Sequence, residues 1–483
     1  MSEQATKKTA GELIVGYFRD FGVLRETRKE YWGIQIVNFL DCTFYFAMLT
    51  IASLFLSHDL GMSDRSAGRI IALFTSATTI LLTVSGMLCD WLGIRKSLRI
   101  SMIAMLLLRG GVVALGLFPS IPNRGIIAAV LLVVMAPFMA GIQTIFQAAT
   151  QRYTTTKSRS AGFNLWYLFM NIGAAAGGYA IDFVRLQLKV SNVHIFTMGV
   201  GTAVLCLLVA ETMVRNEDQL HGLGEDPVTA AEKPKKKRPL EILKDVVREP
   251  AFFRLIVLIA LVLGVRAVYA YLYLLMPKYW ERTIGPDAAI GVLNMINPIG
   301  IVIGLVLFIP LANKFKVFSM LVYGSMVSAL ALAPMALPWQ WYGIGIANAH
   351  YIMAIICMVI VTIGEVLWSP KLYEYTALLA PKGQEGTYLG LSMIPWFLAK
   401  TIVSWFSGDM LNRWSPEKVT VDGAAMPLQQ AMVAGRVDYW NSPAAMWFWL
   451  GVWAMIGCIL ALLLRKWLTE GVRTEASAPA AGH

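Results

Sequence analysis

Long apolar runs alternate with short polar segments along most of the chain. Each run covers roughly 20 residues with few charges, which is the length that a helix needs to cross a hydrocarbon core of about 30 Å. A strand of a membrane barrel would be about half as long. The pattern therefore predicts an all-α membrane protein with twelve transmembrane helices, near residues 33–56, 67–91, 98–119, 125–147, 161–184, 193–213, 252–276, 288–312, 317–338, 350–376, 388–410 and 444–466.

The composition excludes a soluble protein of this length. Of the 483 residues, 57% are apolar and 15% are charged, and the mean hydropathy is +0.60. A water-facing fold could not bury so many apolar side chains. The first 30 residues contain acids and bases without an apolar core or a small-residue cleavage site. No signal peptide is predicted, and we expect the first span to act as the targeting signal.

The chain lacks the residue patterns of an enzyme or a metal protein. No CxxC pair, histidine at metal-ligand spacing or Ser-His-Asp set stands out, so neither a metal nor another cofactor is expected. No GxxxxGK[ST] motif is present, which argues against an ATP-driven pump. The cysteines stand singly in or at the ends of spans and are interpreted as core residues: Cys42, Cys89, Cys206, Cys357 and Cys458. The histidines lie in predicted loops, polar segments or a terminus: His58, His194, His221, His350 and His483.

A polar stretch over about residues 214–250 separates two apolar halves of similar length. Its last part, Pro239 to Arg248, has apolar side chains at helical spacing and predicts a short amphipathic helix on the membrane surface. Two six-helix bundles joined by such a linker are the layout of alternating-access carriers. We therefore predict a cytoplasmic N-terminal segment, an N-terminal six-helix bundle, a cytoplasmic linker, a C-terminal six-helix bundle and a disordered tail, over residues 1–32, 33–213, 214–251, 252–466 and 467–483.

Lysine and arginine are distributed unevenly between the two sides of the membrane. If the N-terminus is cytoplasmic, the inner segments hold roughly 27 of these residues and the outer loops about 10. The bias places both termini in the cytoplasm and, without a signal peptide, favours the plasma (inner) membrane of a bacterium. The net charge of +11 is then mainly a topology signal, and the Lys233–Arg238 run needs no nucleic-acid partner.

A motif stands at the end of the second span, where Gly86, Asp90, Gly93, Arg95 and Lys96 occur within eleven residues. The two glycines allow close helix approach and a tight turn, and Asp90 can accept a charge-assisted bond from a neighbouring helix end. The segment resembles the loop 2–3 signature of the major facilitator superfamily, which implies the two-bundle fold of that superfamily and a latch on the cytoplasmic side. Ordinary positive-inside charges are the alternative explanation of Arg95 and Lys96.

Three further segments together resemble the proton-dependent oligopeptide transporter (POT/PTR) family. They are Tyr167-Leu-Phe-Met-Asn171-Ile-Gly173 in span 5, Asn297-Pro298 with an Ile/Val run in span 8, and Gly364-Glu365-Val-Leu-Trp368-Ser369-Pro370 with Glu374-Tyr375 in span 10. The resemblance implies proton-coupled symport of small peptides. It implies a role in substrate binding for Tyr167, Asn171, Asn297 and Trp368, and a role in substrate binding or proton coupling for Glu365.

Two positions depart from that family. Its span 1 has the form E-x-x-E-R-F, whereas this chain has Asn38-Phe-Leu-Asp41-Cys42-Thr43-Phe44, so one acid remains and the arginine is absent. The lysine of its span 4 is also absent, with Gln143 nearby. These are positions at which the family couples protons and holds substrate.

Five ionisable residues fall within predicted spans: Asp41, Arg109, Arg266, Glu365 and Lys400. A charge at this depth costs at least about 2.5 kcal/mol, so each one is a functional hypothesis. We predict that Asp41 of span 1 and Arg266 of span 7 form a salt bridge that acts as a gate, with a static structural pair as the alternative. Glu365 and Lys400 are a second candidate pair, for substrate or proton binding or for structure. Arg109 either holds a substrate carboxylate or reaches a loop carbonyl inside the N-terminal bundle.

The sequence thus predicts a secondary active transporter that works by alternating access. A symporter of protons and a small peptide-like or zwitterionic solute is the first hypothesis, and its aromatic wall includes Tyr269, next to Arg266 on one helical face. The alternative is a carrier, exchanger or exporter of an organic anion or another nutrient, because buried bases outnumber buried acids. An enzyme is not predicted. Expected partners are the solute, protons and the lipid bilayer, and the protein is expected to be a monomer.

Overall fold

The computed structural model describes residue 19 and residues 21–155, 158–214, 249–312, 316–379 and 394–470. Most of the predicted cytoplasmic N-terminal segment, the linker with its predicted amphipathic helix, and the end of the tail lie outside the described residues. Helices dominate the described part of the chain, and each predicted span coincides with a helix over the residues that are described. The prediction of an all-α membrane protein is confirmed.

The long helices are α2 (Lys29–Leu54), α3 (Asp64–Leu92), α4 (Ile94–Leu117), α5 (Arg124–Tyr153), α6 (Arg159–Asp182), α7 (Val193–Met213), α9 (Pro250–Leu274), α11 (Ile290–Ala312), α12 (Val317–Leu330), α14 (Ile346–Leu379), α16 (Ile394–Trp414) and α18 (Pro443–Leu463). Shorter helices are α10 (Met276–Thr283), α13 (Ala333–Ala336), α17 (Leu428–Val433) and α19 (Arg465–Thr469). Short 3-10 helices occupy Phe21–Glu26, Trp339–Tyr342 and Tyr439–Asn441, and π-helical turns extend α2 and α6 over Phe55–Asp59 and Phe183–Gln187. Within the described residues, eight helices are long and apolar enough to cross a membrane.

Helix ends follow the local sequence. Ser63 precedes α3, and its side chain accepts a hydrogen bond from the backbone N–H of Ser66 at 3.2 Å, which satisfies a donor that the first turn leaves unpaired. Pro250 and Pro443 stand in the first turns of α9 and α18, where the missing N–H of proline has no cost. Gly93 separates α3 from α4 with a φ of 79°, a conformation that favours glycine. The motif glycine therefore makes the predicted tight turn.

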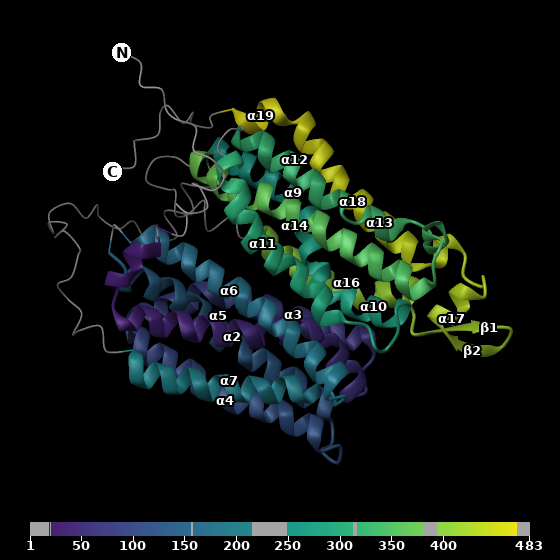
Figure 1. Ribbon diagram of the computed structural model, residues 1–483, viewed down its shortest axis with the longest axis horizontal. Coiled ribbons are helices and arrows are strands. Elements are labelled where there is room, and N and C mark those ends of the chain that lie inside the picture. The colour runs from purple at the N-terminus through teal and green to yellow at the C-terminus, as the bar shows by residue number, and fades with distance from the viewer. Residues whose placement is uncertain are drawn as a thin grey trace. The chain divides into compact units, whose positions relative to one another are not determined.

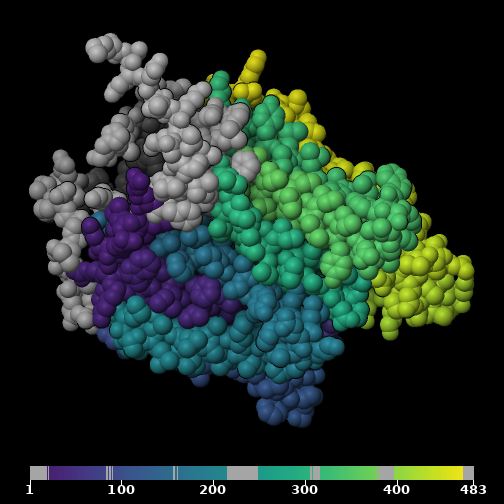
Figure 2. Space-filling model, in the orientation of Figure 1, coloured from purple at the N-terminus to yellow at the C-terminus, as the bar shows by residue number. Residues whose placement is uncertain are grey.

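One small ribbon interrupts the helical pattern of the described chain. Strands β1 (Lys418–Val421) and β2 (Ala424–Pro427) pair antiparallel, with Val421 opposite Ala424. Asp422 and Gly423 form the two-residue turn between them, and both have positive φ values, 51° and 84°. The ribbon and α17 form a projection of their unit (Figures 1 and 2). The Asp-Gly pair is thus the turn of a β-hairpin.

Contacts between elements divide the protein into two compact units. Unit 1 contains the described residues up to 214 together with 289–312, and unit 2 contains 249–288, 316–379 and 394–470. In unit 1, α2 packs on α6, α3 on α5 and α4 on α7, and α11 runs beside α6 (Figure 1). In unit 2, α12 packs on α14, and α9 lies against α16 and α18. Contacts thus group α11 with unit 1, and the division into bundles over residues 33–213 and 252–466 remains a proposal.

Small residues allow α6 to approach α2 closely. A side chain at Gly173 would place its Cβ 2.8 Å from the carbonyl oxygen of Phe39, and one at Gly177 would meet the carbonyl oxygen of Thr43. In membranes, such close backbone packing replaces the hydrophobic driving force between helices. The glycine of the Asn-x-Gly motif therefore serves helix packing.

Replacing Gly177 by alanine should destabilise the protein by about 1–3 kcal/mol, because the new methyl group would overlap backbone atoms of α2. Thermal unfolding of the purified protein in detergent measures the change. Gly201→Ala on α7 is the matched control, since no atom lies within 4 Å of the position that the new Cβ would take. Equal unfolding temperatures for the two variants would contradict the close approach of α2 and α6.

Candidate functional site

Asp41 and Arg109 form a fully buried ion pair inside unit 1. The Nη2 of Arg109 on α4 donates to Oδ1 of Asp41 on α2 at 2.6 Å, and both side chains have 0% exposure. The Nη1 of Arg109 donates to the carbonyl oxygen of Gly199 on α7 at 3.0 Å. The guanidinium also lies 4.0 Å from the centre of the Phe44 ring. One arginine thus joins α2, α4 and α7 through bonds that are strong in an apolar interior.

Of the two roles considered for Arg109, its contacts match the one inside the N-terminal helices, and the carbonyl belongs to a helix instead of a loop. The predicted partner of Asp41 was Arg266, which lies in unit 2. The Oδ2 of Asp41 has no hydrogen-bond partner among the described residues. The gate between Asp41 and Arg266 therefore stays a prediction, and Arg109 is the partner that sequence reasoning did not assign to Asp41.

The span 5 motif contributes to packing between α2 and α6. The Nδ2 of Asn171 donates to the carbonyl oxygen of Tyr167, one turn earlier in α6, at 2.9 Å. From α2, Nδ2 of Asn38 donates to the carbonyl oxygen of Trp166 at 3.0 Å. Asn171 is buried and Tyr167 is partly buried. Asn297 on α11 is also buried in unit 1. A role of Tyr167, Asn171 and Asn297 in substrate binding stays a prediction.

A polar network links three helices in the interior of unit 2. The hydroxyl of Tyr269 on α9 lies 2.7 Å from Oγ of Ser328 on α12 and donates to the carbonyl oxygen of Val361 on α14 at 3.1 Å. The indole N–H of Trp368 on α14 lies 3.1 Å from both the Tyr269 hydroxyl and Oγ of Ser328. Tyr269 and Trp368 are buried. This network fixes the orientation of both aromatic side chains.

Two cations lie against the aromatic rings beside this network. The guanidinium carbon of Arg266 on α9 is 4.4 Å from the centre of the Trp368 ring and 5.4 Å from that of Trp396 on α16. The Nζ of Lys400, also on α16, is 4.6 Å from the Trp396 ring centre. Arg266 is 5% exposed, and its Nε and Nη2 have no hydrogen-bond partner among the described residues. The pairing of Lys400 with Glu365 stays a prediction.

Glu365 also belongs to this region of unit 2. It lies partly buried in α14, one turn before Trp368. Its carboxylate and the guanidinium of Arg266 both act electrostatically on the hydroxyl of Tyr269. Tyr271 has a different environment, since its ring packs on Trp447 of α18 with centres 6.0 Å apart. Arg266, Tyr269, Glu365, Trp368, Trp396 and Lys400 are called the aromatic cation cluster below.

Comparison with protein families supplies the classification. The family model described as "Major Facilitator Superfamily" matches residues 34–404. The chain belongs to the major facilitator superfamily. It is therefore a transporter and a multi-pass membrane protein, and not an enzyme.

Solved structures of superfamily members share the fold of this chain at low sequence identity. A crystal structure of peptide transporter POT in complex with sulfate matches with a TM-score of 0.70 and 15% identity, over 92% of this chain and 96% of that one. A D-xylose-proton symporter matches with a TM-score of 0.66 and 14% identity, over 92% and 98%. A POT family transporter in complex with 5-aminolevulinic acid matches with a TM-score of 0.64 and 15% identity, over 91% and 96%. Comparison with curated proteins gave no match.

The superfamily's loop 2–3 motif holds the junction of α3 and α4 against α7. The Nη2 of Arg95 lies 3.0 Å from Oε2 of Glu211 near the end of α7, and Arg99 binds the same carboxylate through Nε and Nη2. Lys96 is exposed. Gly86 and the side chain of Asp90 lie outside what the structure describes. Glu211 was not predicted from the sequence. It could have been found as an isolated acid at the end of an apolar span, on the same side of the membrane as a basic loop. The latch role of the motif stays a prediction.

Asp182, the last residue of α6, is a second functional candidate that sequence reasoning missed. It is 7% exposed, and its two carboxylate oxygens accept hydrogen bonds from the backbone N–H groups of Gly291 and Val292 at 2.8 and 2.7 Å. These groups belong to the first turn of α11, where helices leave donors unpaired and favour a negative charge. The carboxylate therefore fastens the start of α11 to the end of α6.

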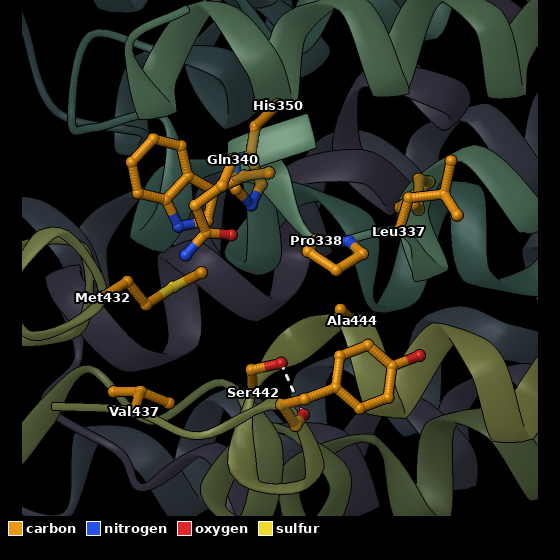
Figure 3. Close-up of a pocket in the computed structure, with 11 residues that line it drawn as sticks. Leu337, Pro338, Gln340, His350, Met432, Val437, Ser442 and Ala444 are labelled. Atoms are coloured by element: carbon orange, nitrogen blue, oxygen red, sulfur yellow. Dashed lines mark hydrogen bonds between the residues drawn. The ribbon is translucent and has the colours of Figure 1, made fainter. Parts of the chain in front are cut away.

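A cavity of about 160 Å³ lies in unit 2, and no residue of the aromatic cation cluster lines it. His350 and Gln340 lie on one side of it and Ser442 and Ala444 on the other (Figure 3). His350 is buried in the first turns of α14, where Nδ1 lies 2.9 Å from the carbonyl oxygen of Ile346. The interpretation of this histidine as a loop or polar-segment residue was therefore wrong. None of the predicted substrate-binding residues lines this cavity.

Proposed function

We propose that the protein is a secondary active transporter that works by alternating access and couples the entry of protons to the symport of a small peptide-like or zwitterionic solute. The observation that carries the proposal is the aromatic cation cluster. In it, the guanidinium carbon of Arg266 lies 4.4 Å from the centre of the Trp368 ring, and the carboxylate of Glu365 belongs to the turn of α14 just before Trp368. A zwitterionic solute needs binding groups of both signs in a mostly apolar site, and this cluster supplies them.

The structural neighbours are compatible with a small solute and with proton coupling. One of them, a POT family transporter, binds 5-aminolevulinic acid, which carries both an amine and a carboxylate. The D-xylose-proton symporter is a relative of similar fold that couples transport to protons. Sequence identities near 15% carry the fold and leave the solute of this chain as our proposal.

In the proposed cycle, Glu365 exchanges a proton. Its charge helps to balance Arg266 and Lys400, so protonation changes the electrostatic balance of the cluster and the affinity for the solute. Arg266 and Asp41 remain the proposed gate. We further propose that Arg109 acts as a structural partner of Asp41, in place of the substrate-binding role considered from the sequence. The superfamily's rocking of two bundles supplies the change in access.

An organic anion carrier or exchanger is the second candidate. It is favoured by one specific observation, that Arg266 and Lys400 both lie over the single ring of Trp396. An anionic solute would neutralise this concentration of positive charge. A panel of labelled organic anions, tested for exchange without a proton gradient, distinguishes this function from proton symport.

Further parts of the proposal concern the setting. The distribution of lysine and arginine supports a plasma (inner) membrane location with both termini in the cytoplasm. We propose that a monomer is the working unit, with a cytoplasmic linker joining two six-helix bundles.

Glu365→Gln should abolish the stimulation of uptake by an inward proton gradient, because glutamine cannot exchange a proton at this position. The test reconstitutes the purified protein in liposomes and follows labelled alanylalanine and 5-aminolevulinic acid. Solute exchange without a gradient should persist in the variant. Glu374→Gln is the matched control on the same helix, since the Glu374 carboxylate is already paired with Nζ of Lys371 at 2.6 Å. Gradient stimulation that survives in Glu365→Gln would exclude the coupling role of this residue.

A further inference from the structure

Two donor groups of Arg266, buried in unit 2, have no hydrogen-bond partner among the described residues. Arg266 is 5% exposed, and these donors are the N–H groups at Nε and Nη2. A buried charged donor without a partner is costly, and such groups occur where a ligand or another partner completes the site. Nε and Nη2 together form one edge of the planar guanidinium, which matches the spacing of two oxygens of a carboxylate.

Aromatic rings hold this edge in a fixed orientation. The guanidinium carbon lies 4.4 Å from the Trp368 ring centre and 5.4 Å from that of Trp396. Trp368 is itself held by hydrogen bonds from its indole N–H to Tyr269 and Ser328. The plane of the guanidinium is therefore set before any ligand arrives, which reduces the entropy lost on binding.

The local charge also favours an anion. Lys400 places a second cation 4.6 Å from the centre of the Trp396 ring that Arg266 also contacts. The cluster has one acid, Glu365, against these two bases. Even when Glu365 is ionised, the cluster keeps a net charge of one positive unit, and a carboxylate would neutralise it.

We propose that Arg266 binds the carboxylate of the transported solute side-on through Nε and Nη2, with Lys400 as the second cation. The aromatic faces of Trp368 and Trp396 form the walls of this subsite. This inference rests on the proposed function and assigns a polarity to it. The acidic end of the solute binds the guanidinium edge, and its amine lies toward Glu365 on α14.

Binding of a carboxylate can be measured without transport. The full-length protein, purified in detergent, is titrated with propionate and with propionamide, which has the same shape without the charge. We expect propionate to raise the unfolding temperature and to change the tryptophan fluorescence in a saturable way, because a ligand of the folded state stabilises it. Propionamide should produce neither change at the same concentrations.

Variants of Arg266 test whether the guanidinium edge binds the carboxylate. Arg266→Gln should weaken propionate binding by about 10-fold or more, the effect of losing charge-assisted hydrogen bonds. Arg266→Lys keeps the positive charge but loses the paired N–H donors, and it should bind propionate severalfold more weakly than the wild type. The matched control is Arg254→Gln, on the same helix, whose arginine already binds Glu470 at 2.7 Å and lies near Trp467. It should bind propionate as the wild type does.

Equal effects of propionate and propionamide on the wild type would overturn the carboxylate subsite, even if an arginine variant failed to fold. Wild-type affinity in a folded Arg266→Gln variant would do the same. Alanylalanine uptake in liposomes separates this inference from the proposed function. Arg266-dependent propionate binding without any alanylalanine uptake supports the subsite and refutes peptide transport. The opposite outcome is alanylalanine uptake that alanylalanine amide inhibits as well as unlabelled alanylalanine does, and that Arg266→Lys does not change. This outcome leaves the function in place and refutes the subsite.

Discussion

Replacing Arg109 by methionine should destabilise the protein by about 3–5 kcal/mol, because Asp41 would remain as an uncompensated charge with 0% exposure. The double variant Asp41→Leu/Arg109→Met should recover most of this loss, since two apolar side chains of similar volume restore a neutral interior. Thermal and denaturant unfolding in detergent micelles, measured for both single variants and the double variant, give the coupling energy of the pair.

The pair of Arg95 and Glu211 is the control for this cycle. Both side chains are partly exposed, at 28% and 40%, so Arg95→Met should change stability by less than about 1 kcal/mol. A similar small effect at Arg109 would contradict a buried, coupled pair. Transport by the double variant separates the two interpretations of Asp41. A static pair predicts that gradient-driven uptake persists, and a gate predicts that it is lost. If Asp41→Asn and Arg266→Gln each spare transport, a gate formed by these two residues is wrong.

The apolar pattern predicted where the helices run but not which side chains meet. In a membrane protein, both lipid and bundle interior are apolar, so the periodicity of a span hardly distinguishes its buried face from its lipid face. Leu107 on α4 is 70% exposed, and Arg109 two positions later is fully buried. The sequence therefore identified Asp41 and Arg109 as charges that are costly to bury. It could not predict that the two side chains face each other, because it does not show which sides of α2 and α4 are in contact.

The resemblance to a transporter family located the aromatic cation cluster better than the residue pattern alone. Glu365 and Trp368 were predicted from the span 10 motif. Arg266 and Tyr269 were predicted to share a helical face because they are three residues apart. Ser328, which completes the network, stands in an otherwise unremarked span. A serine bonds its own helix as readily as a neighbour, so its type alone does not reveal its partner.

Asp182 shows a different limit of sequence reasoning. An acid at the end of a span is expected at a membrane surface, so it attracts no attention. Its significance depends on α11, which begins more than 100 residues later and supplies the two N–H groups. Gly178 and Gly291 allow this contact, since a side chain at Gly178 would meet the Gly291 carbonyl oxygen at 2.6 Å. Two glycines facing each other across distant spans give no signal in a single sequence.

Replacing Asp182 by alanine should loosen the start of α11 and raise the population of molecules in which this turn is open to solvent by about tenfold or more. The change removes two hydrogen bonds to a charged acceptor, each worth about 1.5–3 kcal/mol, and leaves two backbone donors without it. About 1.4 kcal/mol corresponds to a factor of ten in population. The reporter is Met295→Cys, whose native side chain packs on Gly178, and the measurement is its rate of labelling by a membrane-impermeant maleimide. The five native cysteines are buried, so background labelling should be low.

Asp182→Asn tests whether charge or shape holds the contact, because asparagine keeps one acceptor oxygen and loses the charge. It should fall between the wild type and Asp182→Ala. Asp59→Ala is the control, since Asp59 also ends a helical segment of unit 1 and accepts a bond from Asn192 at 2.9 Å without contacting α11 by that bond. Under the proposed bundles, α6 and α11 belong to opposite halves, and we predict that the Asp182 bonds break during the transport cycle. Faster labelling together with slower uptake at limiting solute would then identify Asp182 as part of a gate. Unchanged labelling in Asp182→Ala would show that the glycine contact alone holds the two helices together.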